Sequence, residues 1–212
     1  MIDRMEQIPG VARVQTRVVF DVNLDVPGMI EPAIGRLISI PDRGEPLLNN
    51  LYLRAGRMPE PREDDAVGVS ECFAQAHELQ AGDTVVAILN GRRKELEIVG
   101  IALSPEYLYS IRPGDILPDD KRFGVFWMGL TPMEAAFDMD GAFNNVTASM
   151  MPEANEAEIL ARLDDLTETY GGQGAYGRDD QVSHRFISDE IDQLGRMAFI
   201  VPTIFLSVAA FL

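Results

Sequence analysis

The last sixteen residues of the chain, MAFIVPTIFLSVAAFL (197–212), carry no charged side chain. A helix that is apolar on all sides is surrounded either by protein or by lipid. As a helix the segment would reach about 24 Å, at about 1.5 Å per residue. The hydrocarbon core of a bilayer is about 30 Å thick, so the segment is too short to cross it. We expect residues 197–212 to be the truncated start of a transmembrane helix; a buried core helix is the alternative.

The polar residues before this segment have a helical apolar stripe. Ile187, Ile191, Leu194 and Ala198 lie four, three and four residues apart. This spacing places them on one narrow face of an otherwise polar helix. Because no helix stop signal follows, we expect a stalk helix over 181–196 that continues into the apolar segment.

A second pattern has a period of two residues. From Val14 to Val26, apolar residues and Thr16 alternate with a mostly polar set that includes Gln15, Arg17 and Asp21. Alternation of this kind is typical of a strand with one face on a core and the other in water. The pattern predicts one long strand over 14–26.

The remaining residues alternate between short strand and helix patterns. Strands are predicted at 36–40, 66–70, 84–89, 95–103, 123–129 and 144–150, and helices at 71–79, 132–139 and 153–170. Residues 51–65 are interpreted as a loop after their first few positions. The order predicts an α+β domain with a mixed sheet over 9–180, in which a β-rich lobe at roughly 50–130 is inserted between an early and a late part.

Composition argues against several classes of function. The chain has 34 acidic and 18 basic residues, a net charge of −16 that disfavours nucleic-acid binding. Cys72 is the sole cysteine, so an intramolecular disulfide is impossible, and two histidines, His77 and His184, offer little for a zinc site. We predict neither a metal nor a cofactor.

No catalytic constellation is recognisable either. Neither Lys94 nor Lys121 follows a glycine, as a phosphate-binding loop requires, so any ATP hydrolysis is expected on another chain. Cys72 and His77 would face different directions on one helix. The acidic stretch DMDG (138–141) lacks the further carboxylates of a calcium loop. We therefore predict no catalytic residue.

Residues 51–105 contain an ordered series of short motifs. Gly56-Arg57-x-Pro59 is followed by an acidic stretch, a short strand, a Ser-led helix, a Gly82-Asp83 turn and a strand ending in Val-Gly100-Ile. In this order the series resembles the extracytoplasmic domain of MacB/FtsX-type ABC transporter permeases. The segment IPGVARV (8–14) is similar to the one that follows the first membrane helix and its stalk in that family. The resemblance spans nearly the whole chain and is weakest at 104–142.

The resemblance implies a permease domain on the extracytoplasmic (periplasmic) side of the inner (plasma) membrane. It implies a partner ATP-binding cassette ATPase and a dimer with a second or homologous permease copy. Further partners would be a periplasmic adaptor, a lipoprotein or a hydrolase. ATP hydrolysis would then drive export, lipoprotein release or activation of a partner protein. Flanking membrane helices are expected outside residues 1–212.

The same resemblance gives the two ends of the chain a mechanical role. Residues 1–8 would be the end of a first stalk helix. The stripe of the second stalk, with Ile187, Ile191, Leu194 and Ala198, would pack against it at Ile2 and Met5.

Two other functions are compatible with the residues. A self-contained acidic hydrolase would gather two or more of Asp119, Asp120, Asp138 and Asp140 in one cleft. A tail-anchored adhesion or ligand-binding module would use residues 197–212 as its anchor.

Overall fold

The computed structural model describes residues 1–26, 28–112, 114–115 and 117–211. Residues 27, 113, 116 and 212 and the side chain of Val208 lie outside the description. Contacts divide the chain into two units, Met1–Ala175 and Tyr176–Leu212.

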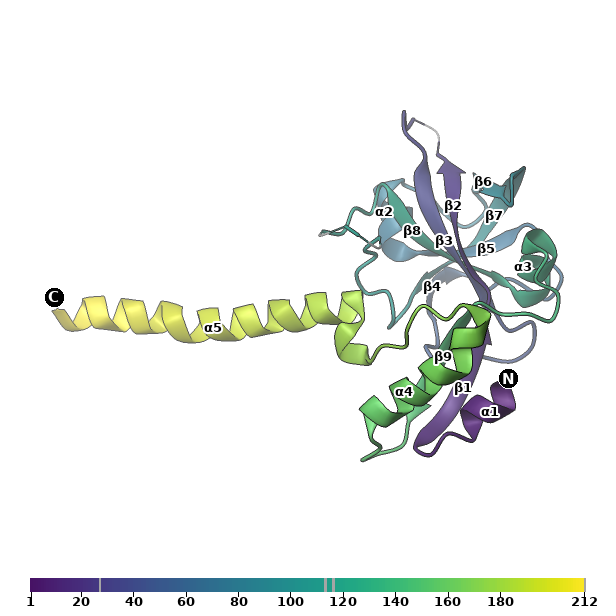
Figure 1. Ribbon diagram of the computed structural model, residues 1–212. Helices are drawn as coiled ribbons and strands as arrows, with labels where there is room; N and C mark the ends of the chain where they lie inside the picture. The colour runs from purple at the N-terminus through teal and green to yellow at the C-terminus, as the bar shows by residue number, and fades with distance from the viewer. Residues whose placement is uncertain (27, 113, 116, 212) are drawn as a thin grey trace. The chain divides into compact units, whose positions relative to one another are not determined.

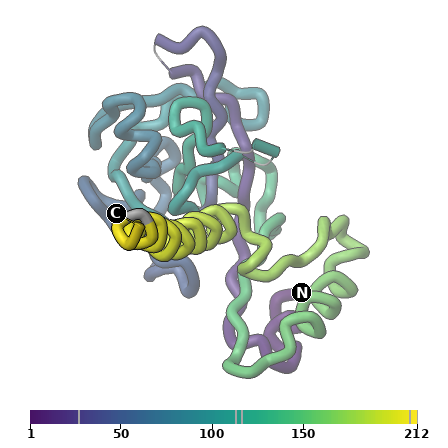
Figure 2. Tube along the Cα trace, turned by 90° about the vertical axis from the view of Figure 1, so that its left-hand side faces the viewer, coloured from purple at the N-terminus to yellow at the C-terminus, as the bar shows by residue number. Residues whose placement is uncertain are grey.

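The first unit contains a small two-stranded sheet at one end. Strand β1 (Val11–Arg17) pairs antiparallel with β9 (Asn145–Met150), so that the two ends of the unit lie side by side (Figure 2). Helices α1 (Ile2–Glu6) and α4 (Glu156–Thr167) pack on this pair. Their shared core contains Met5, Ile8, Val11, Val14 and Ile159.

The larger sheet is formed by seven strands, in the order β4-β7-β5-β8-β3-β2-β6. Strand β6 also pairs with β7, so the sheet closes on itself and β4 is left as an added edge strand (Figure 1). The pairs β3–β8 and β5–β7 are parallel and the others are antiparallel, which confirms the predicted α+β class with a mixed sheet. The strands are β2 (Val19–Asp25), β3 (Ala33–Ile40), β4 (Tyr52–Gly56), β5 (Ala66–Ser70), β6 (Thr84–Leu89), β7 (Arg92–Leu103) and β8 (Phe123–Gly129).

Two helices lie against the larger sheet. Helix α2 (Glu71–Ala76) contacts β5, β7 and β8, and α3 (Leu130–Phe137) contacts β3 and β8. The fully buried Phe73 of α2 meets Phe126 of β8 edge-on, with ring centroids 5.3 Å apart. Short 3-10 turns, η1 (Glu168–Tyr170) and η2 (Arg178–Asp180), follow α4.

The single long strand predicted over 14–26 is wrong. The chain forms β1 up to Arg17 and β2 from Val19, and the two halves belong to different sheets. Val18, between them, is fully buried and bonds to Ser39 rather than continuing either ladder. Alternation in sequence shows that each residue is extended, but it does not show which strand each half pairs with.

The β-rich lobe is larger than the predicted 50–130. Its sheet begins at Val19 in β2 and ends at Gly129 in β8, so the whole lobe is inserted between β1 and β9. The strand β4, in the segment interpreted mainly as a loop, was missed. All five of its residues are exposed, and an exposed strand has no hydrophobic periodicity to detect.

Local signals placed other elements well. The strands at 66–70, 84–89 and 123–129 occur where they were predicted. Ser70 precedes α2, but its hydroxyl accepts a bond from the Val125 N–H instead of capping the helix. Helix α3 begins at Leu130, slightly before the predicted start at residue 132. The Thr131 hydroxyl donates a hydrogen bond to Asp42.

The second unit is dominated by α5 (Val182–Phe211), one continuous helix of 30 residues that includes Pro202 (Figure 1). Its length is about 45 Å. The polar striped part and the apolar part are therefore one helix, without a break between them. Among the described residues, α5 is the one helix long and apolar enough to cross a membrane. Leu212, the last residue of the predicted apolar segment, lies outside the described residues.

Candidate functional site: the joint between the two sheets

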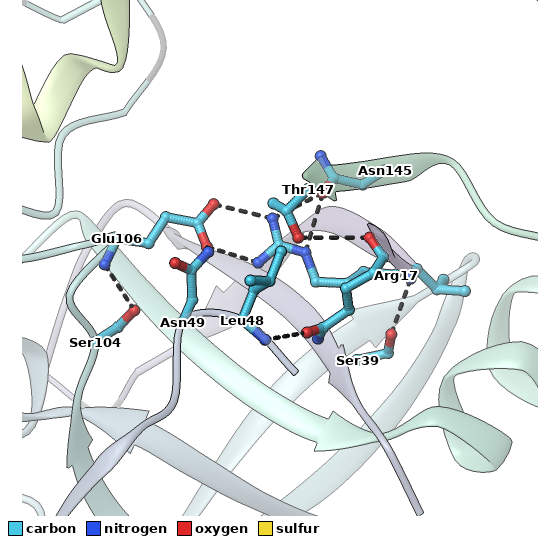
Figure 3. Close-up of polar contacts among 10 residues, drawn as sticks. Arg17, Ser39, Leu48, Asn49, Ser104, Glu106, Asn145 and Thr147 are labelled. Carbon is cyan, nitrogen blue, oxygen red and sulfur yellow. Dashed lines mark hydrogen bonds and ion pairs between the residues drawn. The ribbon is translucent and has the colours of Figure 1, made fainter. Parts of the chain in front are cut away.

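A buried ion pair connects the two sheets of the first unit. Arg17, at the end of β1, donates from Nη1 to Oε2 of Glu106 at 2.6 Å and from Nη2 to Oε1 at 2.9 Å (Figure 3). The side chains are 6% and 17% exposed, respectively. Glu106 lies in the loop after β7, so this two-point contact joins the small sheet to the large one. Paired guanidinium–carboxylate bonds fix orientation as well as distance.

Amide side chains complete the same network. The Arg17 Nε and Nη2 groups both donate to Oδ1 of Asn145 on β9, at 3.0 and 2.8 Å. The Asn49 amide donates to Glu106 Oε2 at 2.9 Å, which brings in the loop before β4. The Leu48 N–H in that loop donates to Oε1 of Gln15 on β1 at 2.8 Å (Figure 3). Two strands and two loops therefore meet around one guanidinium group.

The backbone between β1 and β2 is held from both sides. The Val18 N–H donates to the Ser39 hydroxyl at 2.8 Å, and the Ser39 N–H donates to the Val18 carbonyl at 2.9 Å. On the other side, the Asn144 side chain accepts from the Val19 N–H and donates to the Val19 carbonyl, both at 2.8 Å. We call Arg17, Glu106, Asn145 and these backbone clamps at Val18 and Val19 the joint.

A buried phenol and a second ion pair lie beside the joint. Burial, together with the negative charge of Glu106, raises the pKa of Tyr107 to about 12. Arg36 forms two hydrogen bonds to Asp21, at 2.7 and 2.8 Å. Although burial by itself lowers the pKa of Arg36, its partners Asp21 and Tyr107 raise it overall. At neutral pH, Arg36 is therefore charged and Tyr107 is neutral.

This arrangement provides rigidity. Every charged group in the joint is engaged by an opposite charge or an amide. A buried pair that is satisfied at every donor costs several kcal/mol to break. The joint is suited to hold the two sheets at one angle.

The sequence did not reveal the joint. Arg17 and Gln15 were expected in water because they alternate with apolar residues, yet they are 5% and 9% exposed. The partners of Arg17, Glu106 and Asn145, lie 89 and 128 residues away from it in the sequence. A sequence pattern has no signal for a contact over such a separation.

The family-like motif residues converge on a short part of β7. Gly56 pairs with Gly100. A Cβ atom at Gly56 would overlap the Val99 carbonyl, and one at Gly100 would overlap the Arg57 carbonyl just after β4. The Arg57 N–H donates to Val99 at 2.9 Å, and its guanidinium donates to Glu63 by two bonds of 2.7 Å. Pro59 follows, partly buried.

The Gly82–Asp83 turn meets β7 beside this point. The Gly82 N–H donates to Ile98, and the Ile98 N–H donates to Asp83, each at 2.8 Å. The motif residues thus hold β4 and the turn before β6 against the Ile98–Gly100 segment of β7.

The predicted stalk residues lie in both units. Ile2 is 38% exposed on α1, whereas Met5 is fully buried in the small core beside Ile159. On α5, Ile191 and Leu194 are 62% and 67% exposed, Ala198 is exposed and Ile187 is partly exposed. The packing of the stripe against α1 stays a prediction.

The acidic residues proposed for a hydrolase lie on different elements. Asp119 and Asp120 are in the loop before β8, where burial and the Asp119 charge raise the pKa of Asp120. Asp138 ends α3 and accepts a bond from Asn90 at 3.1 Å, and Asp140 is exposed beyond it. None of the four lines the pocket between β4 and α2 or the pocket between α1 and α4.

Cys72 and His77 do not form a reactive pair. Burial, with the charges of Asp120 and Glu71, raises the pKa of the Cys72 thiol, so it is not a thiolate at neutral pH. The His77 ring lies against Phe73 at a tilt of 49°, with centroids 4.4 Å apart, and its Nε2 lies 2.9 Å from the Lys121 carbonyl oxygen. Among the described residues no group of acidic, histidine and cysteine side chains could hold a metal ion.

Comparison with known proteins gives structural likenesses only. No known family profile matches the chain, and no curated protein sequence does. Among solved structures, 30 chains match. One is the extracellular domain of the noncanonical ABC-type transporter YknZ from Gram-positive bacteria, with 15% identity, 82% of this chain and 84% of that chain covered, and a TM-score of 0.48.

A second is the periplasmic region of MacB from Actinobacillus actinomycetemcomitans. It has 15% identity, 79% of this chain and 72% of that chain covered, and a TM-score of 0.44. YknZ is described as an ABC-type transporter. MacB gives its name to the MacB/FtsX-type family, which residues 51–105 resemble. Both TM-scores are below 0.5, so these likenesses by themselves carry no argument about this chain.

Proposed function

We propose that this chain is the extracytoplasmic domain of an ABC transporter permease subunit in the inner (plasma) membrane. The observation that carries the proposal is α5. One uninterrupted helix runs from a polar striped part into an apolar part that is long enough, with its neighbours, to enter a bilayer. The order of motifs over 51–105 supports the same assignment by its resemblance to that family.

In this proposal the domain transmits force and performs no chemistry. ATP is hydrolysed by a separate cassette subunit on the other side of the membrane. The movement reaches the domain through α5 and is used for export, lipoprotein release or activation of a partner protein. The joint supports such a role because it fixes the angle between the small sheet and the large sheet. A movement of β1 or β9 is then transmitted to the large sheet and is not absorbed by bending between the two sheets.

The two stalks of the proposal would meet at the stripe of α5. Because Met5 is buried in the small core, Ile2 is the one of the two predicted α1 residues whose side chain is exposed for a contact with Ile191 and Leu194. A second permease copy would complete the transporter, with a periplasmic adaptor, lipoprotein or hydrolase as a further partner.

Labelling of a single cysteine tests the side of the membrane. Cys72 is the sole native cysteine, so Cys72→Ser gives a background without thiols. Glu168→Cys in that background places a thiol at an exposed site after α4. A maleimide that cannot cross membranes should label it in intact spheroplasts. Labelling only after lysis would contradict the extracytoplasmic assignment.

Purification of the native protein tests the coupling. An affinity tag on the gene in its native host should recover from solubilised membranes a complex that hydrolyses ATP. The gene itself should encode apolar helices on both sides of residues 1–212. A protein that fractionates with the soluble proteins, without ATPase activity, would overturn the proposal.

A further inference from the structure

The edge strand β4 is the least protected part of the large sheet. It pairs with β7 on one side, and among the described residues no strand pairs with its other side. All five of its residues are exposed, and Tyr52 is 64% exposed. An edge strand of this kind presents unpaired N–H and C=O groups to any extended segment that approaches.

The charged side chain that would protect the edge of β4 is paired with a neighbouring helix. Arg54 is the one charged residue of β4, and a charged side chain on an edge keeps other strands away. Its Nε donates to Oε1 of Glu71 on α2 at 3.0 Å. The positive charge of Arg54 is therefore balanced by Glu71, and its side chain is held towards α2. The backbone N–H and C=O groups on the outer edge of β4 stay accessible to an approaching strand.

A pocket adjoins this edge, between β4 and α2. Its volume is about 550 Å³, and it is open to solvent. Ala55, Ala74, Leu79 and Ile101 give it an apolar wall. A strand added to β4 would lie about 4.8 Å away and would point every second side chain to this side of the sheet.

The charge of the pocket selects the side chain that would enter it. Glu71 is paired with Arg54, but Glu78 has no ion pair among the described residues, and Gln75 and Gln80 add only neutral amides. The pocket therefore has an apolar wall and an unpaired carboxylate at its rim. A lysine or arginine fits both features, because its stem is aliphatic and its end is cationic. The chain's net charge of −16 would also favour the approach of a basic segment.

We propose that the free edge of β4 and the adjoining pocket bind an extended segment of a partner protein, with one lysine or arginine side chain of that segment in the pocket. The backbone of the segment supplies affinity by adding a strand to the sheet, and the pocket supplies specificity. The residues that form this surface all belong to the first unit, and the proposal does not use the membrane assignment, so it can fail without the proposed function failing.

A labelled peptide tests the proposal directly. The capped peptide TVTKTVT, with a fluorescent label, is titrated with the full chain in detergent micelles and its anisotropy is measured. The peptide TVTETVT should bind about tenfold more weakly, because a like charge then faces Glu78. Equal affinity of the two peptides, or no binding by TVTKTVT, would overturn the proposal.

Two complementary patterns of backbone N-methylation test the strand addition. A strand that pairs by one edge uses the N–H groups of alternate residues, so one pattern should abolish binding and the other should preserve it. Equal binding by both methylated peptides would contradict pairing with β4.

Substitutions in the protein locate the site. Glu78→Lys should weaken the binding of TVTKTVT about tenfold. Glu168→Lys makes the same charge change at an exposed site that is not part of the pocket, and it should leave the binding unchanged. Far-UV circular dichroism verifies that both variants fold.

Hydrogen exchange of the β4 amides without peptide tests whether a second copy of the chain is the occupant. Protection of these amides that rises with protein concentration would overturn the proposal in favour of self-pairing.

Discussion

The unit Met1–Ala175 and the helix α5 treat their side chains in opposite ways. In the first unit even a charged residue, Arg17, is 5% exposed and bonded to Glu106 and Asn145. In α5 the large apolar Phe199 and Phe205 are 75% and 71% exposed. The first unit satisfies its own groups, whereas α5 has apolar surface that only another environment can cover.

The largest effect is expected at the joint. Arg17→Gln leaves the Glu106 carboxylate without its cation and should lower the free energy of unfolding by about 3–5 kcal/mol. Urea unfolding in mild detergent measures it. Arg13→Gln is the matched control on the same strand, because Arg13 is exposed, and it should change the stability by less than about 0.5 kcal/mol. Equal effects of the two variants would show that burial of Arg17 contributes nothing.

A charge in the apolar part of α5 should act on membrane insertion. Ile204→Lys is expected to disfavour insertion by about 3 kcal/mol, as a cation does in the centre of a membrane helix. Alkaline carbonate extraction of membranes from cells that express residues 1–212 alone should release this variant. Gln193→Lys, in the polar part of the same helix, should stay with the membrane. If both variants remain bound, the apolar part of α5 is not what anchors the chain.

The contact between β4 and β7 should tolerate no side chain at Gly100. In Gly100→Ala the new methyl group would overlap the Arg57 carbonyl, and the shift of β4 should cost about 1–3 kcal/mol of unfolding free energy. Gly68→Ala is the control, since its methyl group would meet Met58 at 3.6 Å, an ordinary contact. A stable Gly100→Ala with an unstable Gly68→Ala would reverse the assignment of the motif glycines.

The smallest effect is a loss of folding stability at alkaline pH, which does not occur at neutral pH. Burial, with the Glu106 charge, raises the pKa of Tyr107 to about 12 in the folded chain, above its ordinary value of about 10. The unfolded chain would lose this proton first, so the stabilisation is complete below about pH 10 and is lost as the pH rises through about 12. Tyr107→Phe should remove this alkaline loss.

Tyrosinate absorbance gives the measurement. The difference between the titrations of the native chain and Tyr107→Phe should have its midpoint near 12. Tyr170→Phe, in which the tyrosine that is removed is 74% exposed, is the matched control for the loss of one tyrosine. A midpoint near about 10 for the Tyr107→Phe difference would mean that Tyr107 is not buried beside the joint.

Local sequence signals predicted the separate elements well. The strands at 66–70, 84–89 and 123–129 are short runs bounded by turns, and residues 182–211 form one helix because no stop signal interrupts them. These features depend on neighbours within a few residues, where turn chemistry and periodicity act. The α+β class follows from their order.

The tertiary structure alone decided how these elements combine. It divided the run over 14–26 between two sheets, made β4 an edge strand, and buried Arg17 against a carboxylate 89 residues away. Each of these depends on which distant backbone or charge becomes a partner. An extended or polar residue looks the same in sequence whether its partner is water or protein. Pairing over long separations is what the fold adds, and in this chain it produces both the joint and the open edge of β4.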